Sequence, residues 1–146
     1  AVTETWLDEK KLDSISMPGF KFLSKHRIGK KGGGVGFFVD SRIQLTIIDD
    51  QFHALNITSF EFYFISIIVE KFKNIILGVI YRPPNSNLNV FNEEIHNLLN
   101  RLILQDRNRT VFLMGDFNIN LLKPDVINLL QLSLMNCQHT SFFLFF

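Results

Sequence analysis

The segment Gly115-Asp116-Phe117-Asn118 combines a carboxylate and an amide directly after an apolar run, residues 110–114. If that run is a strand, Asp116 and Asn118 stand two residues apart at its end and point to the same side. A carboxylate there can orient or deprotonate an attacking water, and a neutral amide can donate hydrogen bonds to a phosphate oxygen. The pair suits phosphodiester hydrolysis; the alternative is a turn in which Asp and Asn bond their own backbone.

Two further segments carry polar side chains suited to the same chemistry. Thr3-Glu4-Thr5-Trp6 offers one acid, Glu4, between residues of good strand propensity, where rigid backbone can hold a metal-binding carboxylate. Tyr81-Arg82-Pro83-Pro84 places a phenol and a guanidinium at a strand end, from which Tyr81 and Arg82 could reach a phosphate. Each has a simpler interpretation when taken singly, namely a solvated Glu near a terminus and a strand that proline ends.

A glycine-rich run, residues 32–36, follows Lys30 and Lys31. It is not the phosphate-binding loop of P-loop enzymes, because no Gly-Lys-Ser or Gly-Lys-Thr follows the glycines. We interpret it as a flexible loop that enters a strand, with Lys30 and Lys31 as weaker candidates for contact with a nucleic-acid backbone.

The elements that must position these side chains are mostly strands. Residues 34–40 and 43–48 are short runs rich in β-branched or aromatic side chains, and Ser41-Arg42 could turn between them. Residues 60–69 and 74–81 flank a short polar segment, which predicts a hairpin of long, largely buried strands.

Helices are expected to cover these strands. Apolar side chains recur at helical spacing over residues 91–103, with Asn87 or Asn89 available as the N-cap. A second helix is predicted over residues 124–134, because its proline suits a first turn. This order of elements indicates a layered α/β fold whose sheets contain antiparallel pairs, rather than a doubly wound parallel sheet.

The composition indicates a single globular domain spanning residues 1–146. Hydrophobic residues make up 47% of the chain, including 16 Phe, whereas disordered chains are poor in such residues. The net charge is only +1, so a nucleic-acid partner has to be argued from a site and not from a global cationic field. The single cysteine, Cys137, excludes an intramolecular disulfide and a Cys-cluster zinc site, and it fits a reducing intracellular setting.

Both ends of the chain indicate a piece of a longer protein. The first residues have neither an initiator Met nor the order of a signal peptide, and no window reaches the roughly 18 apolar residues of a membrane span. Residues 141–146 are almost entirely large and apolar. They either complete a core strand or form a non-native tail, and the lack of a nearby turn signal or charged gatekeeper favours the second interpretation.

Four motifs in this order resemble the endonuclease domain of non-LTR retrotransposons: TETWL, GGGVGFFV, GVIYRPPNS and LMGDFNINLL. That domain belongs to the endonuclease/exonuclease/phosphatase superfamily, with deoxyribonuclease I and the apurinic/apyrimidinic endonucleases. The resemblance extends from Thr3 to Cys137. It implies a four-layered α/β sandwich of the deoxyribonuclease-I-like type, with two packed sheets and an active site at one rim.

The resemblance also implies roles for individual residues. Glu4 matches the metal-binding glutamate, and Tyr81 matches the tyrosine that contacts the scissile phosphate. Asp116 matches the aspartate that positions the attacking water, and Asn118 the asparagine beside it. The implied cofactor is Mg²⁺, with Mn²⁺ as a substitute, and the implied partner is DNA in an intracellular compartment, nuclear or cytoplasmic.

The chain also departs from the family pattern at both ends. The family begins with a strand whose asparagine lies near the metal, and it ends with a Ser-Asp-His segment. This chain starts after the first, and none of His26, His53, His96 and His139 lies in such a segment. Because losing one such group costs roughly 10²- to 10⁴-fold in rate, we expect near-background activity from the chain alone.

Three functions follow from these observations. The first is target-site nicking as part of a retrotransposon reverse transcriptase polyprotein, and the second is a catalytically dead remnant with at most weak nucleic-acid binding. The third is a phosphatase that acts on phosphoinositides or sphingolipids. Tyr81-Arg82-Pro83-Pro84 and Thr5-Trp6-Leu7 favour the retrotransposon branch over the phosphatases.

Overall fold

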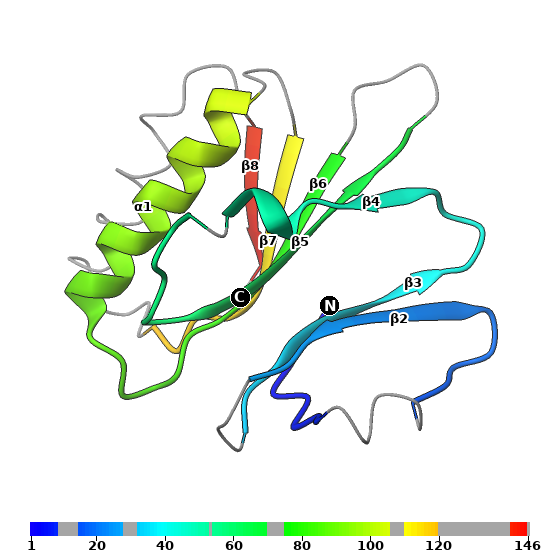
Figure 1. The fold of residues 1–146 in the computed structure, drawn as a ribbon, viewed down its shortest axis with the longest axis horizontal. Helices are drawn as coiled ribbons and strands as arrows, with labels where there is room; N and C mark the ends of the chain where they lie inside the picture. The colour runs from blue at the N-terminus through cyan, green and yellow to red at the C-terminus, as the bar shows by residue number, and fades with distance from the viewer. Residues whose placement is uncertain are drawn as a thin grey trace.

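The computed structural model describes residues 1–8, 15–27, 32–52, 54–69, 75–105, 110–119 and 141–145. These residues form two β-sheets, a long helix and a short 3-10 helix (Figure 1). The elements are β1 (Val2–Thr3), β2 (Phe20–Lys25), β3 (Val35–Asp40), β4 (Leu45–Ile47), η2 (Asp49–Phe52), β5 (Glu61–Ile67), β6 (Ile75–Tyr81), α1 (Leu88–Gln105), β7 (Thr110–Asp116) and β8 (Ser141–Phe145). The predicted helix over residues 124–134 lies outside the described residues, as does Cys137.

The two sheets differ in how their strands run. The three-stranded sheet has the order β1-β3-β2 and is antiparallel throughout. The five-stranded sheet has the order β4-β5-β6-β7-β8, in which β4, β5 and β6 are antiparallel neighbours while β7 and β8 run parallel to β6. The predicted hairpin is confirmed as β5–β6, and α1 lies in the crossover that the parallel β6–β7 pair requires. The chain therefore has α/β content with antiparallel pairs, as expected.

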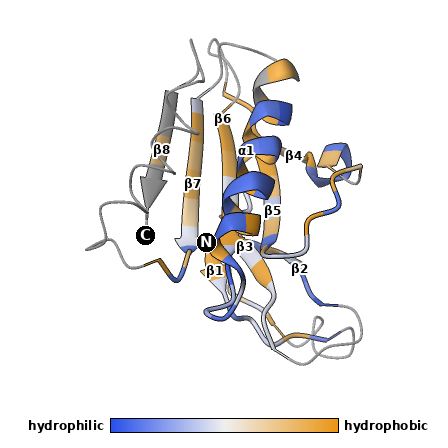
Figure 2. Ribbon diagram, turned by 90° about the vertical axis from the view of Figure 1, so that its left-hand side faces the viewer, coloured by the Kyte–Doolittle hydropathy of each residue, from blue (hydrophilic) through white to orange (hydrophobic). Residues whose placement is uncertain are grey.

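The described elements stack in three layers. Helix α1 covers one face of the five-stranded sheet, and the three-stranded sheet packs on its other face (Figure 1). Strands β5, β6 and β7 are mostly hydrophobic because both of their faces are covered (Figure 2). One buried cluster lies between α1 and the sheet and includes Phe52, Phe64, Ile80, Phe91, Leu98 and Leu113. A second lies between the two sheets and includes Val35, Phe37, Val39, Tyr63, Ile65 and Val79.

Helix α1 begins where the sequence predicts it. Asn87 is the N-cap, because its Oδ1 accepts hydrogen bonds from the backbone N–H groups of Asn89 (2.9 Å) and Val90 (3.3 Å). Glu94 on the helix binds the backbone N–H groups of Thr58 and Ser59, each at 2.9 Å, and so ties the segment before β5 to the helix. The Asn87 cap fixes the start of the helix, and the Glu94 hydrogen bonds fix the helix relative to the five-stranded sheet.

Two strand predictions need refinement. Residues 34–40 and 43–48 do form strands around a turn, in which Ile43 N donates to Asp40 O at 2.9 Å. The two strands join different sheets, however, since β3 pairs with β1 and β2 while β4 pairs with β5. Strand β2 was not predicted. The apolar tail forms β8, parallel to β7 at the edge of the five-stranded sheet, so the structure gives residues 141–145 a place in a sheet.

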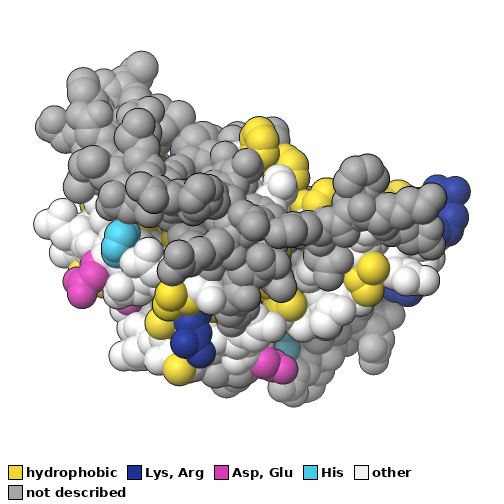
Figure 3. All heavy atoms as spheres, turned by 90° about the horizontal axis from the view of Figure 1, so that it is seen from above, with side chains coloured by type: hydrophobic (Ala, Val, Ile, Leu, Met, Phe, Trp, Pro, Cys, Tyr) yellow, Lys and Arg dark blue, Asp and Glu magenta, His cyan; other side chains and the backbone are white. Residues whose placement is uncertain are grey.

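The charged side chains are dispersed on the molecular surface seen from above. On this face, the described Lys, Arg, Asp and Glu side chains lie in separate places and do not form one large patch of a single charge (Figure 3). Within the described part of the chain, no helix is long and apolar enough to cross a membrane.

Candidate active site at the rim of the sheets

The register of the five-stranded sheet places three polar residues side by side at one edge. Tyr81 ends β6 and lies opposite Asp116, the last residue of β7. Glu61, the first residue of β5, lies opposite Tyr81 on the other side. Because neighbouring strands are about 4.8 Å apart, Glu61, Tyr81 and Asp116 form a continuous row, which we call the rim row.

Glu4 approaches the rim row from the other sheet. It directly follows β1, and its Oε1 accepts a hydrogen bond from the Tyr81 hydroxyl. Its second oxygen, Oε2, accepts a hydrogen bond from the Trp6 indole Nε1 at 2.9 Å. The candidate metal ligand and the candidate phosphate-contacting phenol are 77 residues apart in the sequence, and they touch across the two sheets.

This contact controls the charge of both side chains. The hydrogen bond from Tyr81, followed by that from Trp6, lowers the pKa of Glu4 below its usual value, and the nearby Arg27 charge acts in the same direction. The hydrogen bond to Glu4, together with burial, raises the pKa of Tyr81 to about 12. At neutral pH Glu4 is therefore an ionised carboxylate, and Tyr81 is a hydrogen-bond donor.

The glycine-rich run holds the Glu4 segment against the rim. Backbone N–H groups of Thr5 and Trp6 donate to the carbonyl oxygens of Gly34 (3.3 Å) and Gly33 (2.9 Å). A Cβ at Gly34 would lie only 2.3 Å from Thr5 Oγ1, so this close approach requires glycine. The run is thus a loop that enters β3, as predicted, whereas Lys30 and Lys31 lie outside the described residues.

The Asp116–Asn118 segment is a tight turn whose two polar side chains remain at the surface. Asn118 N donates to Asp116 Oδ1 at 3.0 Å, and the Asn118 amide nitrogen donates to Asp116 Oδ2 at 3.1 Å. The same amide nitrogen also donates to the Arg82 carbonyl oxygen at 2.8 Å. Both Asp116 and Asn118 are exposed, so the turn that was the alternative interpretation also presents the carboxylate and the amide to solvent.

Arg82 occupies a different position from the one expected for a phosphate ligand. Its side chain is buried, and its guanidinium donates to the carbonyl oxygens of Asn118 (2.8 Å), Phe117 (3.3 Å) and Ser86 (2.5 Å). Its backbone N–H donates to the Asp116 carbonyl oxygen at 2.9 Å. The planar fork of donors is therefore directed at the backbone of the Asp116–Asn118 turn, and Arg82 positions this turn instead of facing solvent.

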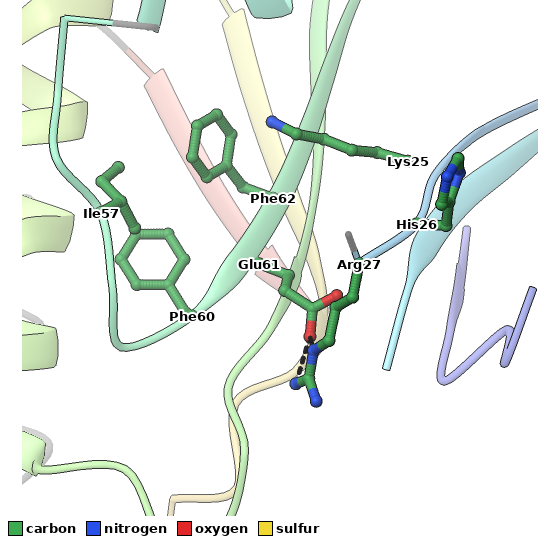
Figure 4. A pocket seen from close by; sticks show the side chains of 7 residues that line it. All are labelled: Lys25, His26, Arg27, Ile57, Phe60, Glu61 and Phe62. Carbon is green, nitrogen blue, oxygen red and sulfur yellow. Dashed lines mark hydrogen bonds and ion pairs between the residues drawn. The ribbon is translucent and has the colours of Figure 1, made fainter. Parts of the chain in front are cut away.

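Sequence reasoning missed Glu61 and Arg27, which extend the site. Arg27 Nε donates to Glu61 Oε1 at 2.5 Å, and the Arg27 guanidinium lies 5.8 Å from the centre of the Tyr81 ring. Glu61 Oε2 also accepts from the Gly34 N–H at 2.7 Å. The predicted hairpin pairs Glu61 with Tyr81, so its register could have identified Glu61 as a site residue. Arg27 follows strand β2, which was not predicted, and no pattern in the sequence pointed to it. The pair borders a cavity of about 200 Å³ lined by Lys25, His26, Arg27, Ile57, Phe60, Glu61 and Phe62 (Figure 4).

Unfavourable backbone conformations are concentrated at this rim. Among the described non-glycine residues, Glu4, Trp6 and Asn118 have positive φ angles of 51°, 53° and 47°. At Glu4 and Trp6 such a conformation costs about 1–3 kcal/mol, whereas asparagine adopts it more readily. Strain retained at Glu4 and Trp6 is typical of a functional site.

The metal chemistry available at the rim depends on Glu4. Among the described residues, no group of three or more His, Cys, Asp or Glu side chains is arranged to hold a metal ion. Mg²⁺ usually binds one or two protein carboxylates and completes its shell with water and substrate phosphate. An exposed and ionised Glu4 fits that sparse ligation.

Comparisons of the chain with protein-family models, curated proteins and solved structures gave no match. The function is therefore argued from the rim residues and their contacts.

Proposed function

We propose that this chain is part of a Mg²⁺-dependent DNA endonuclease of the non-LTR retrotransposon type, which nicks a target site by phosphodiester hydrolysis. One observation carries the proposal: Glu4 contacts Tyr81 across the two sheets, and Tyr81 lies opposite Asp116 in the rim row. A carboxylate for a metal, a phenol for a phosphate and a carboxylate for water are thereby gathered at one edge. These residue types at one edge match the needs of phosphodiester cleavage.

Each rim side chain has a chemical task in this proposal. Asp116 orients the attacking water and takes up its proton, and Asn118 donates from its amide to a phosphate oxygen. In the structure the single hydroxyl proton of Tyr81 is donated to Glu4. In this proposal the hydroxyl turns from Glu4 to a phosphate oxygen when substrate and Mg²⁺ are bound. Glu4 would hold Mg²⁺, which supplies charge neutralisation at the leaving oxygen when bound.

The deoxyribonuclease-I-like sandwich is the fold we propose for the complete domain. The described helix, five-stranded sheet and three-stranded sheet lie in three successive layers, and this arrangement supports the proposal. A fourth layer would cover the outer face of the three-stranded sheet, where Phe20 is exposed. DNA as substrate would place the protein inside the cell, in the nucleus or the cytoplasm.

The second candidate is a catalytically dead remnant with weak nucleic-acid binding. It is favoured by the histidines, since none of the four lies in a Ser-Asp-His segment. We infer that the chain by itself cleaves at a rate near background, even though the rim row is intact, because groups that act as a unit are not additive.

A plasmid-nicking assay with Mg²⁺ or Mn²⁺ tests the proposal. We would compare this chain, a version extended at both ends, and the extended version carrying Asp116→Ala. The extended protein should nick, and Asp116→Ala should reduce the rate roughly 10²- to 10⁴-fold. The control Asp40→Ala removes a carboxylate bound to Arg42 at the far end of β3 and should leave nicking unchanged.

Two outcomes would contradict the proposal. If Asp116→Ala nicks as fast as the parent protein, the rim row is not the active site. If the extended protein leaves plasmid intact but hydrolyses a phosphoinositide headgroup, the phosphatase alternative is correct.

A further inference from the structure

Trp6 is the single tryptophan of the chain, and its side chain is exposed beside the rim row. Its exposed fraction is 61%, whereas Tyr81, which shares the Glu4 carboxylate with it, is 5% exposed. Water contact is unfavourable for an indole, because most of its surface is apolar. An exposed indole at a site of charged and polar groups therefore suggests a flat apolar binding partner.

Three contacts hold the indole in a defined place. The Trp6 backbone N–H donates to the Gly33 carbonyl oxygen at 2.9 Å, and the indole Nε1 donates to Glu4 Oε2 at 2.9 Å. The benzene edge of the ring lies against Gly32, where an added Cβ would be 3.6 Å from the nearest ring carbon. An aromatic ring held in this way loses little conformational freedom when a ligand stacks on it.

The same carboxylate fixes the indole relative to the rim row. Glu4 Oε1 accepts from the Tyr81 hydroxyl while Glu4 Oε2 accepts from the Trp6 indole. The Trp6 indole and the Tyr81 hydroxyl therefore bind the two oxygens of the same carboxylate. A phosphate bound at Tyr81 would bring the nucleoside attached to it close to the indole.

Resting on the proposed function, we propose that Trp6 is a stacking platform for an unpaired nucleobase next to the phosphate at the rim row. A base inside an intact duplex already stacks on its neighbours and has no face free for the indole. Aromatic side chains stack with unpaired bases of any sequence, because every base has a π-face. The preferred ligand is thus single-stranded or locally opened nucleic acid.

The test compares two oligonucleotides that differ only in their bases. One is oligothymidylate, and the other is an abasic oligonucleotide of the same length with the same phosphates. Fluorescence anisotropy of labelled oligonucleotide, with Ca²⁺ replacing Mg²⁺ to prevent cleavage, gives affinities for the 146-residue chain and its Trp6→Ala, Trp6→Phe and Phe20→Ala variants. Phe20 is the matched control, since it is an exposed aromatic residue (44%) at the far end of β2.

We expect Trp6→Ala to weaken binding of oligothymidylate roughly 5- to 100-fold and to leave binding of the abasic oligonucleotide unchanged. Trp6→Phe should keep part of the preference for bases, and Phe20→Ala should keep all of it. Oligothymidylate should also quench the fluorescence of Trp6 in the parent chain, and the abasic oligonucleotide should not. Far-UV circular dichroism verifies that the variants are folded.

Other results would overturn the stacking platform. Equal affinity of the parent chain for the two oligonucleotides would do so, and the nicking assay would still decide the proposed function separately. If Trp6→Ala still binds oligothymidylate more tightly than the abasic oligonucleotide, the bases bind at a site other than Trp6. Failure of the parent chain to bind either oligonucleotide would reject both the platform and nucleic-acid binding by this chain.

Discussion

The hydrogen bond between Tyr81 and Glu4 links a phenol to a carboxylate whose protonation states depend on each other. The Glu4 pKa is lowered, so the contribution of the ionised form to stability is present above its unfolded pKa and is lost as the pH falls through the folded value. The Tyr81 pKa is raised from 10.0 to about 12, so its contribution is fully present below pH 10 and is lost as the pH rises through about 12. The pair is therefore intact across the neutral range.

Replacing the Tyr81 phenol should remove the main cause of the lowered Glu4 pKa. We predict that Tyr81→Phe raises the pKa of Glu4 toward its ordinary value, because the hydrogen bond from Tyr81 is the largest cause of the lowering. A titration of the side-chain carboxyl carbon by NMR measures this pKa. Tyr63→Phe is the control, since Tyr63 is buried between the sheets. An unchanged Glu4 pKa in Tyr81→Phe would show that the contact is absent in solution.

Arg82 is the residue for which the structure changes the interpretation most. Because its buried guanidinium binds three carbonyl oxygens, we predict that Arg82→Ala lowers the free energy of unfolding by about 2–4 kcal/mol. The exposed Arg42, which bonds only to Asp40 among the described contacts, is the control and should lose less than about 0.5 kcal/mol on substitution by Ala. Urea unfolding measures both values, and similar losses in the two variants would contradict the positioning role.

At the scale of elements, local patterns predicted some strands and left others unidentified. Long apolar runs and a polar connection were sufficient for β5 and β6, and an apolar stripe after an Asn cap was sufficient for α1. Strand β2 has two lysines and a serine among its six residues, FKFLSK, and it is a strand because β3 supplies its hydrogen bonds. No local pattern records that partner. For the same reason the sequence could not show that β3 and β4 belong to different sheets.

The close pairing of β6 and β7 depends on Gly115. Its φ is 138°, and a Cβ there would lie 1.9 Å from the Ile80 carbonyl oxygen, inside the neighbouring strand. We predict that Gly115→Ala lowers the free energy of unfolding by about 2–4 kcal/mol. Gly19 also has a positive φ (81°) but nothing within 4 Å of an added Cβ, so Gly19→Ala should cost only about 1 kcal/mol.

Chemical denaturation of the two glycine variants separates backbone strain from steric contact. Both variants carry alanine at a positive φ, so the difference between them reports the clash with β6. If the two losses are equal, the β6–β7 spacing does not depend on Gly115.

At the scale of the whole molecule, the candidate site exists because two sheets pack face to face. The motifs singled out Glu4, Tyr81, Asp116 and Asn118, and the structure brings Glu4 to Tyr81 and Asn118 to Asp116. The sequence could not predict the contacts that hold them, such as the Arg27–Glu61 pair or the Arg82 fork. Those contacts join segments through the register and packing of different elements, which no single segment encodes.

The packing between the sheets should therefore be measurable at the site itself. Phe37 on β3 is 3% exposed and packs beside Tyr63 of the other sheet, with ring centres 6.3 Å apart. Phe52 is 1% exposed and belongs to the other cluster, on the helix side of the five-stranded sheet. Either Phe→Ala change should cost about 3–5 kcal/mol, because each leaves a cavity in a buried core.

Only the cavity at Phe37 lies between the sheet that carries Glu4 and the sheet that carries Tyr81. The two variants should therefore differ at the rim despite a similar loss of stability. We predict that Phe37→Ala loosens the three-stranded sheet against the other sheet, weakens the Glu4–Tyr81 hydrogen bond and raises the pKa of Glu4. Phe52→Ala should leave that pKa unchanged. NMR titration of Glu4 in both variants, below their unfolding temperatures, distinguishes the effects. If the Glu4 pKa moves equally in both, the site responds to global stability and not to the packing of one sheet on the other.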